Sequence, residues 1–418
     1  MTPQPRLAAQ VMAAAPVGPL GVAVSGGGDS VALLLLARAW AAEAGREIVA
    51  VTLDHGLRPE AAAEAADVAR LCAGRGVPHA TLAWRGWDGE GNLQDAARTA
   101  RRRLIANWAR GRGVGAVALG HTLDDQAETF LLRLARGSGV DGLAAMAPVS
   151  RAEGVVWLRP MLELRRADLR RWLAERGVGW AEDPGNADAA FARVRARAAL
   201  EPLEGLGLGA ARLAATAGRM GRARLALEAA TRDLARTALA EGPAGDVSLD
   251  PGRLAAAPEE IRLRLLAGAL CWVAGARFRP RLATLEAAAA AVASGRVGPG
   301  LTLHGCVLRP HRGRIAIRRE PARVAPPAPV EHGIWDSRWA VTVAGADAGL
   351  MIGALGASGL ALRPNWRAAG QAREALLSTP ALWRDGRLAA ALALDASTMV
   401  AFRRVAPSPA PWCDAELR

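Results

Sequence analysis

Lysine and tyrosine are both absent from this chain of 418 residues, and phenylalanine occurs only four times. All 53 basic side chains are therefore arginines, set against 40 acidic ones, and the formal net charge is +13. The lack of lysine beside abundant alanine and glycine is typical of a genome-wide codon bias. The excess over acidic residues still needs a reason, and it favours a polyanionic partner such as RNA, DNA or a membrane surface.

Cysteine is also scarce, and apolar runs are short. The four cysteines are Cys72, Cys271, Cys306 and Cys413, and they form no CxxC pair. This spacing argues against a zinc site and a disulfide framework, so we expect a reducing, cytoplasmic location. No apolar stretch reaches the roughly 20 residues that a membrane span requires, and no membrane partner is predicted.

The most informative stretch is VAVSGGGDSVALLLLA at residues 22–37. Apolar, β-branched residues lead into a glycine turn, and an apolar helical run follows at once. A strand, a glycine turn and a helix N-terminus offer backbone N–H groups to a phosphate. Glycine allows the close approach and a positive φ. The pattern predicts a nucleotide site formed by Ser25, Gly26, Gly27, Gly28, Asp29 and Ser30.

The spacing of the glycines shows which known type of nucleotide-binding loop the segment fits. A Walker A loop needs a lysine after its last glycine, where this chain has Asp29, and the fingerprint G-x-G-x-x-G does not fit either. The segment resembles the SGGxDS signature of the PP-loop ATP pyrophosphatases, which transfer AMP to an oxygen of the substrate. This resemblance implies that the loop binds pyrophosphate and that Asp29 helps to place Mg²⁺. The alternative is a plain strand–helix turn of small residues.

The first half alternates short apolar runs with longer helical ones, which is typical of a parallel α/β sheet. Ligands bind at the carboxyl ends of such strands, and Ser25, Asp54 and His121 each follow one. Asp54 and His55 are therefore candidate nucleoside contacts; the alternative is a turn before a helix that Pro59 initiates. We expect strands at residues 21–24, 48–53, 79–82 and 114–119, and helices at 31–42, 59–75 and 93–110.

A second motif, GHTLDDQAETFLLRLARGSG, occupies residues 120–139 and opens a helix. Asp125 and Glu128 lie three residues apart and share a helix face, so their carboxylates are candidates to bind an ammonium group or a metal ion. The alternative is that they offset the helix dipole. His121 is a candidate general base near neutral pH; the alternative is a histidine with a structural hydrogen bond.

The second half is expected to be helical and then mixed. The segment FARVRAR is interpreted as extended, with Arg193, Arg195 and Arg197 pointing to one side to bind phosphates; a solvated edge strand is the alternative. Other expected features are helices at 167–176, 210–241, 259–275 and 280–294, a turn at Asp183-Pro184-Gly185, a hairpin at 311–313 and a proline-rich linker at 321–329.

Several motifs in one order resemble the tRNA(Ile)-lysidine synthases over about residues 18–200. They are SGGGDS, DHGLRPEA (54–61), NLQDAAR (92–98), the segment 120–143, RPMLELRRADLRRWL (159–173) and WAEDPGN followed by FARVRAR. The resemblance implies that ATP adenylates the ring carbonyl oxygen of the wobble cytidine in a CAU-anticodon tRNA(Ile). The ε-amine of L-lysine then displaces AMP. It also makes a homodimer a reasonable expectation.

The resemblance assigns roles by motif position. Residues 25–30 would bind ATP, Asp125 and Glu128 would recognise lysine, His121 would lie beside the amine, and the three arginines at 193–197 would face RNA. The catalytic set is then Asp29, His121, Asp125 and Glu128. The sequence departs from the family pattern at Arg101-Arg102 and at Gly185. These departures affect the expected packing and RNA contacts and do not touch the residues assigned to the reaction.

The expected fold is α/β, with a parallel, Rossmann-like sheet of the adenine nucleotide alpha hydrolase type. The expected domains are an ATP-binding catalytic domain at residues 1–205, a mainly helical tRNA-binding region at 206–320 and a mixed α+β domain at 321–418. Two other functions remain open. One is another PP-loop enzyme, such as a thiolase or glutamine-dependent synthetase, although their reactive cysteines or amidotransferase domain are not seen. The other is a basic RNA-binding protein with an inactive nucleotide fold.

Overall fold

The computed structural model describes residues 5–56, 61–85, 93–182, 190–343, 349–395 and 400–405. The chain forms two compact units, one ending at Leu225 and the other beginning at Ala226. The division falls inside the long helix α9 (Ala210–Ala238). The three-domain division expected from the sequence stays a prediction. Among the helices described, none is both long and apolar enough to span a bilayer.

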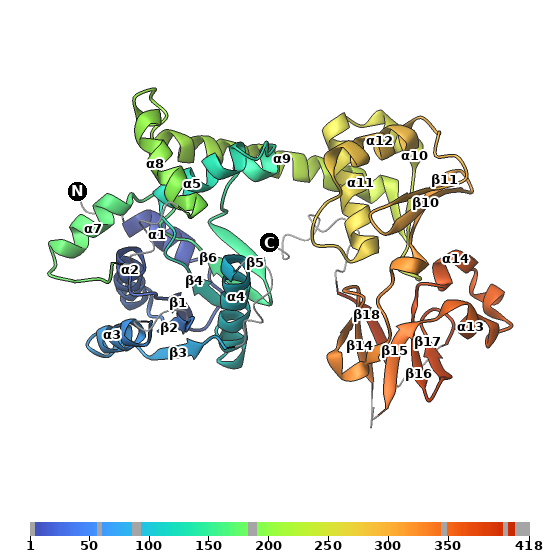
Figure 1. Cartoon of the computed structure of the whole chain (residues 1–418), viewed down its shortest axis with the longest axis horizontal. Coiled ribbons are helices and arrows are strands. Elements are labelled where there is room, and N and C mark those ends of the chain that lie inside the picture. The colour runs from blue at the N-terminus through green and yellow to red at the C-terminus, as the bar shows by residue number, and fades with distance from the viewer. Residues whose placement is uncertain are drawn as a thin grey trace. The chain divides into compact units, whose positions relative to one another are not determined.

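The first unit is built on a six-stranded sheet in the order β3-β2-β1-β4-β6-β5 (Figure 1). Five strands are parallel and β5 pairs antiparallel with β6, which confirms the α/β fold and the four predicted strands. The strand order reverses between β1 and β4, where such sheets bind ligands. The strands are β1 (Leu20–Ala23), β2 (Ile48–Asp54), β3 (His79–Ala83), β4 (Ala116–Ala118), β5 (Val149–Ala152) and β6 (Val155–Leu158).

Helices cover both faces of this sheet because successive strand residues point to opposite sides. Helix α2 (Gly28–Ala44) carries the run VALLLLA and packs on the face that contains Leu20 and Val22. Helix α4 (Leu93–Gly111) packs on the opposite face with Val51 and Trp157. The other helices are α1 (Pro5–Met12), α3 (Ala61–Ala73), α5 (Leu123–Leu134), α6 (Val140–Leu143), α7 (Arg166–Ala174) and α8 (Ala192–Glu204).

The segment that carries the three alternate arginines is helical, and the extended interpretation is wrong. Arg193, Arg195 and Arg197 lie in the first turns of α8. Alanine, arginine and leucine favour a helix, and this propensity outweighs the alternation in the sequence. On a helix, Arg193 and Arg197 share a face, whereas Arg195 points elsewhere. The three side chains therefore do not form a single row.

The second unit begins with the end of α9 and packs three helices on a five-stranded sheet in the order β7-β8-β11-β10-β9. The expected hairpin is confirmed, since β10 and β11 are joined by Arg312 and Gly313, whose φ values are 50° and 76°. Residues expected to extend the long helix form β7 instead. The elements are α10 (Pro251–Ala256), α11 (Glu259–Ala274), α12 (Leu282–Ala293), β7 (Leu239–Glu241), β8 (Val247–Leu249), β9 (Leu301–Leu303), β10 (Cys306–His311) and β11 (Arg314–Arg319).

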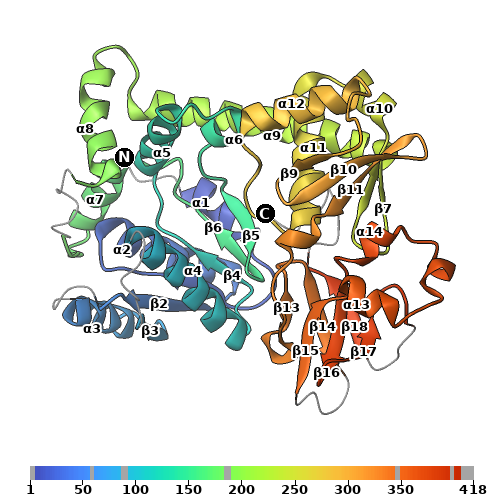
Figure 2. The ribbon, with the colours of Figure 1, turned by 45° about the vertical axis from the view of Figure 1, so that its right-hand side comes forward.

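The last part of this unit holds a four-stranded and a three-stranded sheet (Figure 2). The segment expected to be a linker forms a 3₁₀ helix and strand β12, and Val324 and Ala328 pack on a core that includes Ile352. The elements are η2 (Pro321–Arg323), β12 (Ala328–Pro329), η3 (Val330–His332), β13 (Ile334–Trp335), β14 (Trp339–Val343), β15 (Leu350–Ala354), α13 (Gly356–Ala361), η4 (Trp366–Ala369), α14 (Arg373–Leu376), β16 (Pro380–Arg384), β17 (Arg387–Ala391) and β18 (Val400–Arg404).

Candidate active site

The glycine loop connects β1 to α2, as the sequence predicts. Gly26 has φ of 90°, which confirms the expected positive φ, and α2 begins at Gly28. The Ser30 hydroxyl closes the loop: it accepts from the Ser25 N–H at 3.1 Å and donates to the Gly27 carbonyl at 2.8 Å. Gly27 has no side chain to cap α2, so no side chain of the N-cap residue competes with an anion for the N–H groups of the first turn.

Two other segments pack closely against this loop, and a glycine lies at each contact. A Cβ on Gly120 would lie 3.2 Å from the backbone of Ser30, so the segment that follows β4 lies close to the first turn of α2. A Cβ on Gly28 would lie 3.4 Å from the ring of Trp180, and the N–H of Ala181 donates to the Gly26 carbonyl at 3.0 Å. The predicted turn Asp183-Pro184-Gly185 lies outside the described residues.

Three of the predicted acidic residues meet around one guanidinium group, that of Arg166. Its Nε donates to Asp29 Oδ2 at 2.9 Å, while Nη2 lies 3.2 Å from Asp125 Oδ1 and Nη1 lies 3.4 Å from Glu128 Oε1. Arg197 Nε also lies 2.9 Å from Glu128 Oε1. The side chain of Glu128 is 1% exposed. The nucleotide loop and the acidic motif are thus parts of one site.

Arg166 lowers the pKa of two of these carboxyl groups, while burial raises it. Burial raises the pKa of Asp29 above its ordinary value, and Arg166 opposes part of that rise. For Asp125, burial acts in the same direction, but Arg166, His121 and Thr122 outweigh it and hold the pKa below its ordinary value. The pKa of Arg166 is raised by the three carboxylates, although burial opposes this. Arg166 therefore favours the charged form of both Asp29 and Asp125.

Asp125 also performs the structural role that the sequence left open. The Thr122 N–H and hydroxyl both donate to Asp125 Oδ2 at 2.8 Å, and the Asp125 N–H donates back to the Thr122 hydroxyl at 3.4 Å. This is a capping box at the start of α5. Asp125 therefore stabilises the helix N-terminus and belongs to the cluster as well.

The capping box predicts a measurable loss of stability. Replacing Thr122 with alanine is expected to lower the free energy of unfolding by about 1 kcal/mol, because an orphan N–H of α5 and a fixed Asp125 are both lost. Urea denaturation followed by circular dichroism measures the change. Thr122→Ser keeps the hydroxyl and should behave like wild type, so equal midpoints for the alanine and serine variants would contradict the assigned cap.

Three buried polar atoms in this region have no hydrogen-bond partner among the described residues. They are Asp29 Oδ1, Glu128 Oε2 and His121 Nδ1. Buried polar atoms are normally paired, so three unpaired ones in one region point to a ligand. Asp29 Oδ1 is a hard oxygen beside a phosphate loop and fits Mg²⁺. The described part of the chain has no group of three or more ligating side chains, so such an ion would also need oxygens from ATP.

The two histidines of the predicted site are both uncharged at neutral pH. Burial lowers the pKa of His121 to about 3, with Asp125 opposing and Arg159, Arg193 and Arg98 adding to the effect. Burial and Arg101 lower the pKa of His55. A histidine with a pKa near 3 accepts a hydrogen bond but holds a proton only weakly at pH 7.

Asp54 is the last residue of β2 and His55 follows it, so both lie at the strand end. No hydrogen bond or ion pair of the described residues joins them to residues 25–30 or to Arg166. Asp54 Oδ1 accepts from the Gly56 N–H at 2.8 Å, which is the turn that the sequence offered as the alternative. The ring of His55 packs edge-on against Trp84, with centroids 6.0 Å apart. Their contact with a nucleoside stays a prediction.

The arginines of α8 take separate roles. Arg197 pairs with Glu128, and Arg193 lies close enough to His121 to lower its pKa. The Nη1 of Arg195 donates to the Ala190 carbonyl at 2.7 Å. Arg193 and Arg197 therefore face the acidic site, in agreement with their shared helix face.

The sequence interpretation gave no role to Arg166 or Asp124. Asp124 Oδ2 accepts from the Arg166 N–H at 2.7 Å, and its Oδ1 lies 3.4 Å from Arg165 Nε. One signal was available, since two consecutive arginines open α7, where positive charge opposes the helix dipole. Such a start requires an acidic partner, and Asp124 supplies it.

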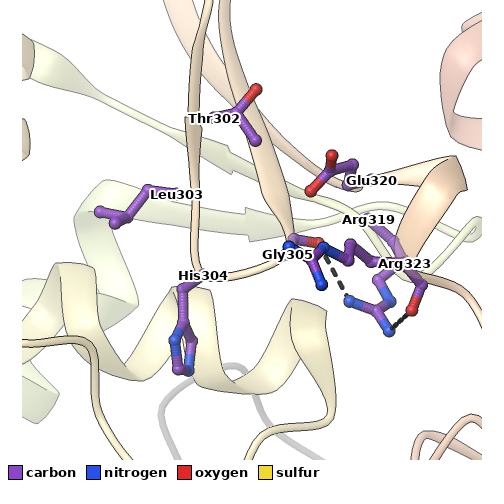
Figure 3. Close-up of a pocket in the computed structure, with 7 residues that line it drawn as sticks. All are labelled: Thr302, Leu303, His304, Gly305, Arg319, Glu320 and Arg323. Carbon is purple, nitrogen blue, oxygen red and sulfur yellow. Dashed lines mark hydrogen bonds between the residues drawn. The ribbon is translucent and has the colours of Figure 1, made fainter.

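A cavity of about 480 Å³ lies in the second unit (Figure 3). One lining residue is Arg319, whose Nε and Nη2 lie 3.1 and 3.0 Å from the oxygens of Asp336 and whose Nη1 donates to the Gly305 carbonyl at 3.1 Å. Its charge is thus already compensated. The lining residues are Thr302, Leu303, His304, Gly305, Arg319, Glu320 and Arg323.

Comparisons with known proteins identify the family of this chain. The PP-loop domain family matches residues 4–204. A tRNA(Ile)-lysidine synthase of Ruegeria pomeroyi is 46% identical over 377 residues, which cover 89% of this chain and 88% of that protein. Its counterpart from Methylobacterium sp. strain 4-46 is 44% identical, covering 76% and 94%. A U34-tRNA thiolase structure from Methanococcus maripaludis is 15% identical, with a TM-score of 0.45 and coverage of 53% and 76%, and is too distant to bear on function.

Proposed function

This chain belongs to the tRNA(Ile)-lysidine synthase family, and we propose that it joins L-lysine to the wobble cytidine of a CAU-anticodon tRNA(Ile). It is an ATP-dependent ligase of the PP-loop type. One observation carries the proposal: Arg166 contacts Asp29 of the nucleotide loop and Glu128 of the acidic motif, and each carboxylate keeps an unpaired oxygen. The homodimer and the cytoplasmic location remain predictions.

In the first step, the ring carbonyl oxygen of the cytidine attacks the α-phosphorus of ATP, and pyrophosphate leaves. Residues 25–30 and the N-terminus of α2 would bind the departing pyrophosphate through backbone N–H groups. Asp29 Oδ1 would hold Mg²⁺, which supplies positive charge to the phosphates. The product of this step is a cytidine that carries AMP on its ring oxygen.

In the second step, the ε-amine of lysine attacks the ring carbon that bears this oxygen, and the carbon–oxygen bond to AMP breaks. Glu128 Oε2 would hold the amine in its cationic form beside Asp125. The amine must lose a proton before it attacks. His121 is neutral and would accept a hydrogen bond from the amine, so we assign it an orienting role.

Arg193 offers a test of the RNA contacts. Arg193→Gln is expected to weaken tRNA binding several-fold at low salt and to reduce the slope of log affinity against log salt by about one, as for the loss of one phosphate contact. Filter binding over a range of salt concentrations measures both. Arg171→Gln, at an exposed position on α7, is the control. An unchanged slope would place Arg193 outside the RNA interface.

The reaction class is tested by AMP release from labelled ATP with the full chain, tRNA(Ile) and different donors. AMP release that increases when L-lysine is added supports the proposed ligase. Release of AMP with a sulfur donor in place of lysine would favour another PP-loop enzyme. No AMP under any condition would favour an RNA-binding protein with an inactive nucleotide fold.

A further inference from the structure

We propose that Arg166 is a positioning residue that couples the ATP-binding and lysine-binding halves of the site. The inference rests on the proposed function. Each of its three guanidinium nitrogens faces a different carboxylate, those of Asp29, Asp125 and Glu128, at 2.9, 3.2 and 3.4 Å. Asp29 belongs to α2 and the other two to α5, so one side chain links two elements that are remote in sequence.

The contacts divide the carboxylate oxygens into two sets. Arg166 binds Asp29 Oδ2 and Glu128 Oε1, which leaves Asp29 Oδ1 and Glu128 Oε2 unpaired among the described residues. Asp125 keeps no such oxygen, because Oδ1 faces Arg166 and Oδ2 accepts from Thr122. Arg166 fixes one oxygen of Asp29 and, together with Arg197, one oxygen of Glu128, so the other oxygen of each is directed toward its ligand.

The chemistry of guanidinium explains why an arginine is required here. Three carboxylates in one partly buried site repel one another and favour the protonated form, unless a cation lies between them. A guanidinium group presents its donors in a rigid plane and can face several carboxylates in fixed directions. A lysine ammonium is a compact point charge on a flexible stem and cannot fix all three orientations.

The backbone of Arg166 is held as firmly as its side chain. Its N–H donates to Asp124 Oδ2 at 2.7 Å, and the Leu123 N–H donates to the Leu164 carbonyl at 2.9 Å. The first turn of α7 is therefore bonded to the first turn of α5. The backbone of Arg166 is therefore fixed, and its side chain extends to α2. Displacement of this side chain would change the orientation of the Asp29 and Glu128 carboxylates together.

The test compares Arg166→Ala and Arg166→Lys with wild type in lysidine formation, using purified tRNA(Ile). We expect Arg166→Ala to lower kcat/KM for both ATP and lysine by about 100-fold, as for a reacting group displaced by about 1 Å. Guanidinium chloride at low, non-denaturing concentration should partly restore Arg166→Ala, and Arg166→Lys should remain impaired.

The control is Arg171→Gln, on the same helix and paired only with its neighbour Asp168 in an exposed ion pair. Circular dichroism checks folding, and a misfolded variant would not recover with guanidinium. If Arg166→Ala does not fold, the same kinetic measurements and guanidinium rescue are made with Arg166→Gln. Wild-type kinetics for both substrates in Arg166→Ala would overturn the inference. A wild-type protein that forms no lysidine would contradict the proposed function instead.

Discussion

Asp29→Ala is expected to abolish AMP formation while leaving the affinity for tRNA within a few-fold of wild type. Asp29 lies in the first turn of α2, beside the loop that would bind pyrophosphate, and its Oδ1 is unpaired among the described residues. Asp29 would hold Mg²⁺, and a metal ion that neutralises phosphates in the transition state is worth several kcal/mol. The expected loss in rate is therefore about 10³-fold or more.

Release of labelled AMP and filter binding of tRNA measure the two quantities separately. Glu43→Gln is the matched control, because Glu43 is an exposed carboxylate on the same helix. Asp29→Asn tests the charge while keeping the shape, and it should be as inactive as the alanine variant. Normal turnover in Asp29→Ala would contradict the assignment of the glycine loop.

The second large effect is expected for Glu128→Gln, which should raise the KM for lysine by about 10- to 100-fold and change the KM for ATP far less. A hydrogen bond to a charged group contributes about 1.5–3 kcal/mol, and the neutral amide removes the charge that holds the ammonium. The ATP side should be spared because Arg166 keeps its contacts with Asp29 and Asp125.

Steady-state kinetics with each substrate varied in turn provide this comparison. Glu128→Asp retains the charge on a shorter side chain and should lie between wild type and the glutamine variant. Equal increases in both KM values would mean that Glu128 supports the fold of the site and does not bind lysine. This pattern also differs from that of Arg166→Ala, which should impair both substrates.

The sequence predicted the features whose chemistry is local. The glycine loop, the strands beside it and the start of a helix in the second motif depend on residues within a few positions of one another, and the structure contains all of them. The start and end of each element differed by a few residues, since packing decides where helices end. The segment 321–329 was taken for a linker because proline is common there, but its apolar residues pack into a core.

The features that the sequence could not predict depend on long-range contacts. Arg166 is 137 residues from Asp29, and its three partners become neighbours only when α2, α5 and α7 pack together. The alternate arginines of α8 led to a wrong prediction of an extended segment, because their spacing fits a strand while the composition of the segment favours a helix. Asp125 proved to be both a helix cap and a member of the charged cluster, which spacing alone cannot separate.

The central claim is best tested by the incorporation of labelled L-lysine into purified CAU-anticodon tRNA(Ile), with ATP and Mg²⁺, beside CAU-anticodon tRNA(Met) as the control. Label in tRNA(Ile) alone, located at the wobble position by nuclease digestion and mass spectrometry, is the predicted result. Absence of label from tRNA(Ile), with AMP released in the presence of another amine or a sulfur donor, would contradict lysidine formation and retain only the PP-loop chemistry.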